Sequence, residues 1–348
     1  MLHTLIVGLG RSGRGLHAPS LAKARAAAPG LFAAGPVMGH DPRVGEVDGI
    51  RKVASLEDAA RRRPPRDTVV HLCTPPHLRV RALERLAGLG YRRIIVEKPL
   101  ALDLMELAAI ARLRRRWGLD LTVATPWSAS TLSARLLAVR RSGAFGSLRA
   151  ATVLQHKPRF TRTLESPGHP TAFDIEVPHA LAVVVTLAGG ADVAAAELDD
   201  MVLDGTRLPG MGGARMDLVH HTGVLTRLES DLTAPLRERR IVLEFDEAVL
   251  TGHYPCSETD HTAQLSVALP GREATRSVFP DDALTAFLRS CYTRYSRPWG
   301  DRDRGDLPVH VEAVRLLVEA KRLCSPDPYP PYTERREVAG EVDSVVGA

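Results

Sequence analysis

The stretch LIVGLGRSG, residues 5–13, decides the fold of the first half of this chain. Its apolar, β-branched beginning is too short for a helix and predicts a buried strand. The Ala- and Leu-rich stretch 21–28 behind it predicts a helix. A Gly-x-Gly-x-x-Gly pattern between a strand and a helix is typical of a loop that binds the pyrophosphate of a dinucleotide.

Each residue of this loop has a separate predicted task. Gly8 allows a tight turn, Gly10 lets the pyrophosphate approach bare backbone, and Gly13 lets the helix pack closely on the strand. Arg11 and Ser12 lie between these glycines and are expected to contact the cofactor as well. The N-terminal end of the helix would favour the negative charge of the phosphates.

An acidic residue follows the next strand-like run. That run, residues 35–40, ends at Asp41, where a carboxylate commonly accepts hydrogen bonds from the ribose hydroxyls of NAD. Asp41-Pro42 can equally be a plain turn. Arg43 is close enough in sequence to accept a 2′-phosphate, so NAD is the expected cofactor and NADP stays open.

Strand and helix patterns then alternate as far as residue 125, which predicts a parallel, doubly wound sheet. Ligands of such sheets bind beyond the carboxyl ends of the strands. Two further segments are expected at that edge, namely Thr74-Pro75 with His77 behind it, and Glu97-Lys98. We therefore predict that these residues contact the same extended cofactor as the glycine loop.

Chain length and composition indicate a globular protein of two domains. The 348 residues are 44% hydrophobic, and no apolar run approaches the roughly 18 residues of a membrane helix. We expect a Rossmann domain at 1–125, a substrate and oligomerisation domain at 126–328, and an extended tail at 329–348. No secretory leader pattern precedes the first strand, which predicts a cytoplasmic protein without a membrane partner.

Charge and cysteine usage limit the partners. The net charge is +5, but acidic residues are spread among the basic clusters, so solvated surfaces explain them better than nucleic-acid binding does. A basic surface does suit an anionic substrate, such as a phosphorylated or nucleotide-linked sugar. The four cysteines form no C-x-x-C pair and His220-His221 has no third ligand at a suitable spacing, so no metal site is expected.

Three motifs together resemble the Gfo/Idh/MocA oxidoreductase family. They are the glycine loop with His17 behind it, Thr74-Pro-Pro, and Glu97-Lys-Pro-Leu100, of which the last is the most specific. The turn 142–146 before the strand-like run 148–155 is similar to that family's entry into its second domain. The resemblance implies a Rossmann domain followed by an α/β domain with an open, mostly antiparallel sheet, and a homodimer or homotetramer.

The reaction of a C–OH carbon needs a group that moves the hydroxyl proton. Lys98 holds the place of the lysine that has this role in the resembled family, and burial can lower the pKa of a lysine there. Family members with polyol substrates usually carry an Asp and a His four residues apart in the segment that is 173–179 here. In this chain Asp174 and His179 are five apart, about 140° around a helix.

Two arrangements of that segment stay open. On one continuous helix, Glu176 and His179 would share a face and Asp174 would not. If Pro178 starts the helix, Asp174 and Glu176 lie in the preceding loop. In both cases we predict that His179 is a general acid or base, and that Asp174 or Glu176 orients it or binds a substrate hydroxyl.

The chain also departs from the family. Pro76 stands where the family often has Asn, and Arg79 stands where it often has His. Trp127, in a segment near the nicotinamide in the family, either stacks on the nicotinamide or the substrate or belongs to the core. Lys157 and Arg159 either face a phosphate or are exposed charges at the end of a strand.

The resulting prediction is an NAD(P)-dependent enzyme that interconverts a secondary alcohol and a ketone on a sugar, cyclitol or nucleotide sugar. The alternatives are a reductase of a C=N bond, a glycosidase that uses NAD, and a non-catalytic NAD sensor. Lys98 at the cofactor edge argues against the sensor. Fold alone does not decide among the enzymes.

Overall fold

The structure is a computed structural model that describes residues 1–165, 168–257, 259–298 and 307–325. The described chain divides into two compact units, one formed by 1–124 with 284–311 and the other by 125–283 with 312–325. One unit holds a parallel six-stranded sheet and the other a mixed, mostly antiparallel eight-stranded sheet, so the predicted fold class is confirmed. The predicted tail, 329–348, lies outside the described residues.

Unit 1 is built on the sheet β3-β2-β1-β4-β5-β6, in which all neighbours are parallel. The strand order reverses at β1, and the glycine loop leaves β1 at this switch point, where doubly wound sheets bind their ligands. The strands are β1 His3–Val7, β2 Val37–His40, β3 Ile50–Lys52, β4 Thr68–Leu72, β5 Arg93–Glu97 and β6 Asp120–Ala124.

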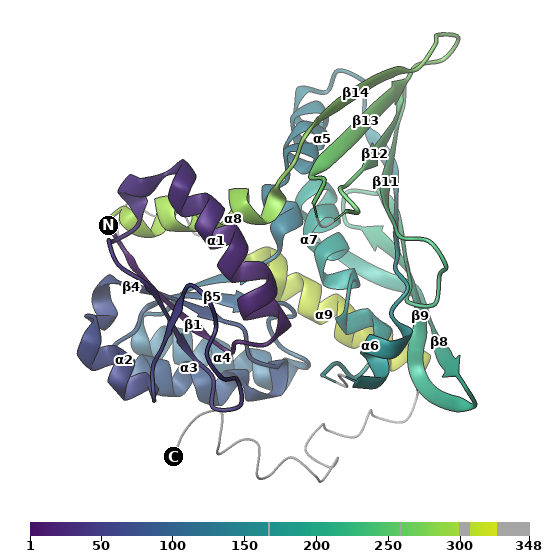
Figure 1. The fold of residues 1–348 in the computed structure, drawn as a ribbon. Helices are drawn as coiled ribbons and strands as arrows, with labels where there is room; N and C mark the ends of the chain where they lie inside the picture. The colour runs from purple at the N-terminus through teal and green to yellow at the C-terminus, as the bar shows by residue number, and fades with distance from the viewer. Residues whose placement is uncertain (166–167, 258, 299–306, 326–348) are drawn as a thin grey trace. The chain divides into compact units, whose positions relative to one another are not determined.

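Helices cover both faces of this sheet, with α3 and α4 on one face and α1 and α8 on the other (Figure 1). Local signals set their ends: Asp103 Oδ1 accepts a hydrogen bond from the Glu106 amide at the start of α4, and Gly118 ends that helix in the left-handed conformation. The helices are α1 Ala18–Ala27, α2 Leu56–Arg62, α3 Arg79–Gly88, α4 Leu104–Trp117 and α8 Ala283–Ser296. A π-helical turn, Gly13–His17, comes before α1, whereas the predicted helix began at residue 21.

Helix α8 returns to unit 1 from far along the chain. Tyr292 and Tyr295 are fully buried there, with Tyr292 Oη 2.5 Å from Thr4 Oγ1 and Tyr295 Oη 2.9 Å from Thr122 Oγ1. The Tyr295 hydroxyl also donates to the Ile94 carbonyl at 3.1 Å. The boundary predicted at residue 125 did not anticipate this return, because only long-range contacts reveal it.

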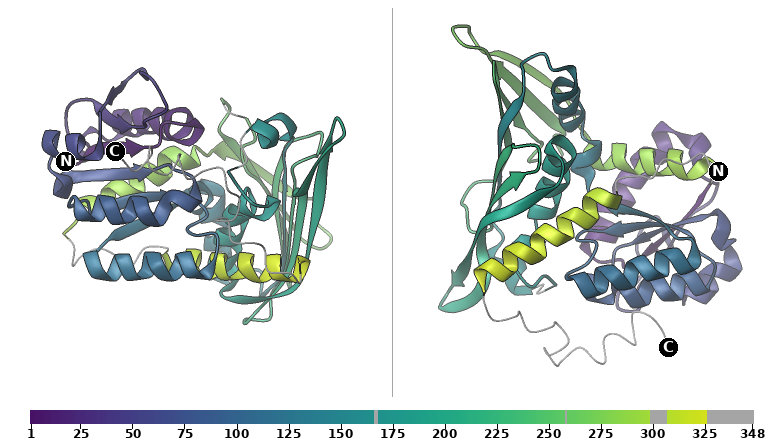
Figure 2. Two further views of the ribbon diagram at one scale, coloured as in Figure 1. Left: turned by 90° about the horizontal axis from the view of Figure 1, so that it is seen from below. Right: turned by 180° about the vertical axis from the view of Figure 1, so that it is seen from behind.

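Unit 2 is built on the sheet β14-β13-β12-β11-β7-β10-β9-β8, in which β7 and β10 are the parallel pair. From Ala151 to Gln155 every second side chain of β7 is buried, which is typical of a sheet with one covered face. Helices α5 and α7 contact the strands on that face (Figure 2). The strands are β7 Leu148–His156, β8 Ala191–Leu203, β9 Thr206–His220, β10 Leu225–Asp231, β11 Glu238–Phe245, β12 Val249–His253, β13 Thr262–Ala268 and β14 Thr275–Pro280.

The helices of unit 2 include the nearly all-apolar α7, which is buried along most of its length. They are α5 Thr131–Ser142, α6 Phe160–Glu165, α7 Val177–Ala188 and the part of α9, Leu307–Cys324, from residue 312 onward. None of the described helices combines the length and the apolar character needed to cross a lipid bilayer.

Candidate functional site

The glycine loop is tightly packed at two of its glycines and open at the third. Gly8 has φ +92°, and a Cβ atom there would lie 2.9 Å from the backbone of Cys73. A Cβ atom on Gly13 would collide with the carbonyl oxygen of Gly8, whereas a Cβ atom on Gly10 would meet no atom within 4 Å. The loop therefore leaves open space at the position where the pyrophosphate is expected.

This difference predicts that adding one methyl group lowers the stability of the protein at Gly13 but weakens cofactor binding at Gly10. Gly13→Ala is expected to lower the free energy of unfolding by at least about 2 kcal/mol, because the backbone of the loop must shift. Gly10→Ala is expected to change it by less than about 0.5 kcal/mol. The same Gly10→Ala change should raise the Kd of NADH about tenfold, since the methyl occupies the open space. Thermal unfolding and NADH fluorescence titration measure both; unaltered NADH binding by Gly10→Ala would contradict the placement of the pyrophosphate.

Asp41 connects the end of β2 to the glycine loop. Its Oδ2 accepts a hydrogen bond from the Leu9 amide at 2.8 Å, and its Oδ1 accepts one from the Arg43 amide at 2.9 Å. The second bond closes the turn that the sequence allowed as an alternative. Each carboxylate oxygen has a further lone pair, so the turn and a contact with a ribose are compatible.

The end of β4 presents an unsatisfied hydroxyl. Thr74 is 3% exposed, and its Oγ1 has no hydrogen-bond partner within the described chain. Buried hydroxyls are usually paired, so this atom has hydrogen-bonding capacity that a ligand could use. Pro75 and His77 are half-buried on either side of Pro76. The orphaned hydroxyl and the open space at Gly10 both fit a bound dinucleotide.

Arg79 holds the turn that follows β5. It is 1% exposed, and its guanidinium donates hydrogen bonds to the carbonyls of Pro99 and Leu100, the second at 3.3 Å. Burial lowers the pKa of Arg79 to about 10, against the opposing carboxylates of Glu97 and Glu106. The Lys98–Pro99 peptide bond in this turn is cis.

The sequence did not predict that Arg79 holds the turn after β5; it indicated only a departure from the resembled family. The available signal was its position at the start of α3, on the face that continues through Ala82, Leu83 and Leu86. A basic residue on an otherwise apolar helical face has to find buried acceptors.

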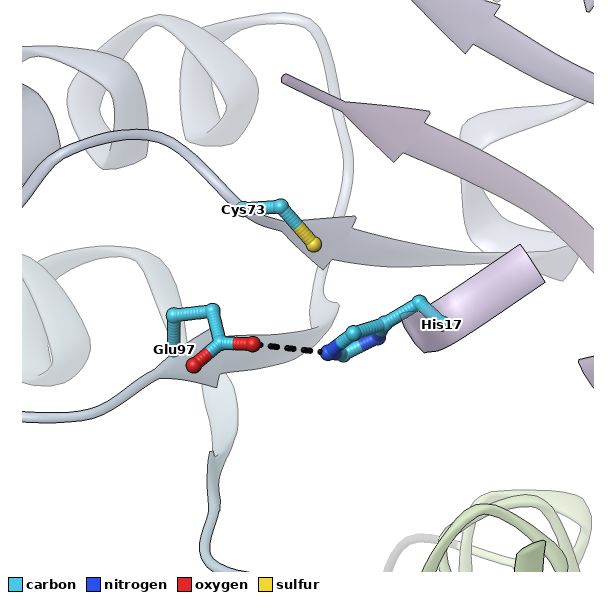
Figure 3. A group of neighbouring side chains, drawn as sticks. All are labelled: His17, Cys73 and Glu97. Atoms are coloured by element: carbon cyan, nitrogen blue, oxygen red, sulfur yellow. Dashed lines mark hydrogen bonds and ion pairs between the residues drawn. The ribbon is translucent and has the colours of Figure 1, made fainter. Parts of the chain in front are cut away.

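Glu97 contacts several polar side chains of unit 1, and Figure 3 shows it beside His17 and Cys73. Its Oε1 accepts a hydrogen bond from the Ser12 hydroxyl and lies 2.9 Å from His17 Nε2. Burial of Glu97 opposes its ionisation, but His17, Ser12 and Lys98 outweigh that effect and lower its pKa to about 2. Burial likewise opposes protonation of His17, but Cys73 and Glu97 raise its pKa to about 10.

A chain of hydrogen bonds continues from His17 into the core. His17 Nδ1 lies 2.9 Å from His71 Nδ1, and His71 Nε2 lies 3.1 Å from the Tyr292 hydroxyl. Burial and the neighbouring His17 keep the pKa of His71 well below its ordinary value. His71 is therefore neutral, and its Nδ1 accepts a hydrogen bond from the N–H group at His17 Nδ1, which fixes the orientation of the His17 ring.

Both carboxylate oxygens of Asp174 in unit 2 are bonded to other side chains of the protein. It is completely buried, its Oδ2 accepts a hydrogen bond from the Thr171 hydroxyl at 2.8 Å, and its Oδ1 accepts one from Lys321 Nζ at 2.7 Å. Helix α7 begins at Val177, so Asp174 and Glu176 come before it, as in the second predicted arrangement. Glu176 Oε1 accepts from Lys157 Nζ at 2.6 Å.

His179 lies in the first turn of α7 and next to an aromatic pair. Trp127 stacks on Tyr254 with ring centroids 4.0 Å apart, and the His179 ring lies 6.2 Å from Trp127 at an interplanar angle of 26°. The structure thus brings His179 to Trp127, which the sequence did not predict. Trp127 is buried, and Tyr254 covers part of its ring surface.

The basic residues after β7 are only partly exposed, contrary to the interpretation as exposed charges at a strand end. Arg159 is 6% exposed, and Lys157 forms the ion pair with Glu176. Burial lowers the pKa of Lys157, Glu176 opposes this, and the positive charges of Arg239 and Arg162 lower it further. Three cations and one carboxylate therefore lie close together in unit 2.

No protein-family model matches the sequence, and no curated protein matches it. Solved structures do match over almost the whole chain. A putative NADPH-dependent oxidoreductase from Desulfitobacterium hafniense has a TM-score of 0.75 at 14% identity, covering 92% of this chain and 95% of its own. At this identity the likeness shows the fold alone.

Two further matches are sugar-modifying enzymes. KijD10, a 3-ketoreductase from Actinomadura kijaniata crystallised with TDP-benzene and NADP, has a TM-score of 0.73 at 14% identity and covers 93% of this chain and 98% of its own. The UDP-N-acetylglucosamine 3-dehydrogenase GnnA from Acidithiobacillus ferrooxidans has a TM-score of 0.71 at 18% identity, with 94% and 99% covered. At such identities the likeness concerns the fold and does not transfer a substrate.

Proposed function

We propose that this chain is an NAD(P)-dependent oxidoreductase that interconverts a secondary alcohol and a ketone on a sugar or nucleotide-sugar ring. The observation that carries the proposal is the open space at Gly10 in the loop after β1, with the unpartnered, buried hydroxyl of Thr74 at the same sheet edge. Both are where a dinucleotide bound at the switch point of the sheet would lie. When bound, the nicotinamide supplies or accepts the hydride.

Lys98 is the proposed proton-transfer group of the reaction. It follows β5 directly, is half-buried, and stands in the turn that Arg79 holds through two carbonyls. In reduction the ammonium donates a proton to the oxygen of the substrate, and in oxidation the amine accepts it. His179 is the second candidate for proton transfer, and Glu97 holds its charge beside Lys98 without taking part in the proton transfer.

An anionic substrate is proposed because of the charges after β7. Lys157, which is paired with Glu176, lies close enough to Arg162 and Arg239 to feel their positive charges. Such a gathering of cationic side chains suits the phosphate or diphosphate of an anionic substrate. KijD10 was crystallised with TDP-benzene and GnnA is described as a UDP-N-acetylglucosamine 3-dehydrogenase, which supports the same class.

A C=N reductase is the second candidate, and one observation favours it. Asp174, the counterpart of a polyol-binding aspartate in the resembled family, is completely buried in a pair with Lys321. An enzyme that reduces an imine needs a proton donor such as Lys98 but no carboxylate for a second hydroxyl. The oxidised forms of both substrate classes therefore belong in the functional assay.

The test is the change in NAD(P)H absorbance with a panel of ligands. The panel contains UDP- and TDP-sugars, sugar phosphates, neutral sugars, cyclitols and cyclic imines, each in the oxidised or reduced form that the assay requires. Turnover of one nucleotide sugar, with neutral sugars at least tenfold slower in kcat/KM, is the expected result. Tight NADH binding with turnover of the imines alone would replace the proposal by its second candidate.

Asp41 is proposed to select NAD over NADP. Asp41→Asn keeps the shape of the side chain and one carbonyl acceptor but removes the charge that repels a 2′-phosphate. The ratio of NADPH to NADH affinity is expected to rise about tenfold. Fluorescence titration with both cofactors measures this ratio. Glu46→Gln, an exposed change nearby in sequence, is the control and should leave the ratio unchanged.

A further inference from the structure

Three different metal-binding side chains converge at the carboxyl edge of the unit 1 sheet. His17 ends the π-helical turn, Cys73 follows β4, and Glu97 ends β5 (Figure 3). One imidazole nitrogen, the sulfur and one carboxylate oxygen lie within 4.8 Å of one another. Among the described residues, this is the one such group of three potential metal ligands. The three residues come from separate segments, so no spacing in the sequence indicates them.

We propose that His17, Cys73 and Glu97 bind a divalent cation of the zinc class. A thiolate, an imidazole and a carboxylate form a donor set of intermediate softness, which Zn²⁺ prefers over Mg²⁺ or Ca²⁺. Metal–ligand bonds of about 2.0–2.3 Å in a tetrahedron place the donors roughly 3.3–3.8 Å apart. The His17–Glu97 separation of 2.9 Å and the 4.8 Å limit of the group lie on either side of this range.

The hydrogen bonds around the group have the form of a supporting shell. His17 Nδ1 is held by His71 at 2.9 Å, which leaves Nε2 facing Glu97. His71 is held in turn by the Tyr292 hydroxyl, and the Ser12 hydroxyl holds Glu97. Ligating imidazoles usually have their other nitrogen fixed by such a partner, which orients the ring and sets its tautomer.

Two of the three side chains are partly exposed. His17 is 1% exposed, whereas the Glu97 side chain is 18% exposed and Cys73 is half-buried. A cation can therefore enter past Glu97 and Cys73 and take the place of the proton between Nε2 and Oε1. Three protein ligands leave one coordination position open, as in zinc sites that bind water or a substrate.

The test is a titration of the full-length, chelator-treated protein with Co²⁺, followed by absorption spectroscopy. A thiolate–cobalt charge-transfer band that saturates at one equivalent and disappears on addition of Zn²⁺ is the expected result. Cys73→Ser should abolish the band, while Cys256→Ser, which removes a half-buried thiol of unit 2, should preserve it. Circular dichroism checks that both variants are folded.

Affinity gives a second readout that does not depend on the thiol. Glu97→Gln is expected to weaken Co²⁺ binding by about 10–100-fold, and His71→Phe, which removes the support of His17, by a similar factor. The proposal is overturned if the wild type gives no band, if Cys73→Ser keeps it, or if Cys256→Ser loses it as well. None of these readouts depends on the proposed oxidoreductase activity.

Discussion

Lys98→Met is expected to lower kcat by about 10²–10⁴-fold while the Kd of NADH changes less than threefold. The methionine keeps the length of the side chain in the turn after β5 but cannot donate or accept a proton. Lys98→Arg should not restore turnover, because a guanidinium keeps its proton throughout the accessible pH range. Steady-state rates on the best substrate of the panel and NADH fluorescence titration measure the two quantities.

Two variants serve as comparisons for this experiment. Lys23→Met, at an exposed position of α1, should leave both kcat and Kd unchanged. His179→Gln separates the two candidate proton-transfer groups, because the group that acts in the reaction removes one limb of the pH–rate profile when replaced. If His179→Gln lowers kcat more than Lys98→Met does, the assignment of Lys98 is wrong.

Asp174→Asn is expected to lower the free energy of unfolding by about 3–5 kcal/mol. The change leaves the ammonium of Lys321, which is 8% exposed, without its buried counter-charge 2.7 Å away. Urea unfolding followed by far-ultraviolet circular dichroism measures the loss. The folded fraction of the variant should retain most of its kcat, because both oxygens of Asp174 are already occupied by Thr171 and Lys321.

A double-mutant cycle distinguishes this ion pair from a general packing defect. Lys321→Met combined with Asp174→Asn should recover part of the lost stability, since no unpaired buried charge remains. Asp217→Asn provides the matched control, because it removes an exposed pair with Arg227 and should leave the unfolding midpoint unchanged. Loss of turnover without loss of stability in Asp174→Asn would instead support a role in catalysis.

The elements of unit 1 could be predicted because their signals are local. The glycine loop, the Asp103 cap and the Gly118 stop each lie within a few residues of the structure that they determine. The first helix was placed late because the π-helical turn before it has no sequence signature. The fold class could be predicted from the alternation of strands and helices, because this order is typical of a parallel sheet.

The candidate site could be predicted only in part. Lys98 and the loop residues carry motifs, but the roles assigned to them remain predictions. The environment of Asp174 depends on Lys321, almost 150 residues further along the chain, and that of Arg79 on carbonyls that any sequence would supply. The group of His17, Cys73 and Glu97 likewise exists only after three strands are aligned. Pairings of this kind are set by packing, which a single sequence does not display.

The return of α8 to unit 1 has a consequence for synthesis on the ribosome. When residue 124 emerges, the parallel sheet is complete in its strands, yet the hydroxyls of Tyr292 and Tyr295 that reach Thr4, His71 and Thr122 are still untranslated. The nascent sheet therefore has α1 but lacks α8 on one of its faces (Figure 1) while all of residues 125–283 are made. In unit 2, Asp174 likewise has no ion-pair partner until Lys321 has been translated. The native packing of each unit is therefore completed only late in translation, by α8 in unit 1 and by α9 in unit 2, and partly packed intermediates precede it.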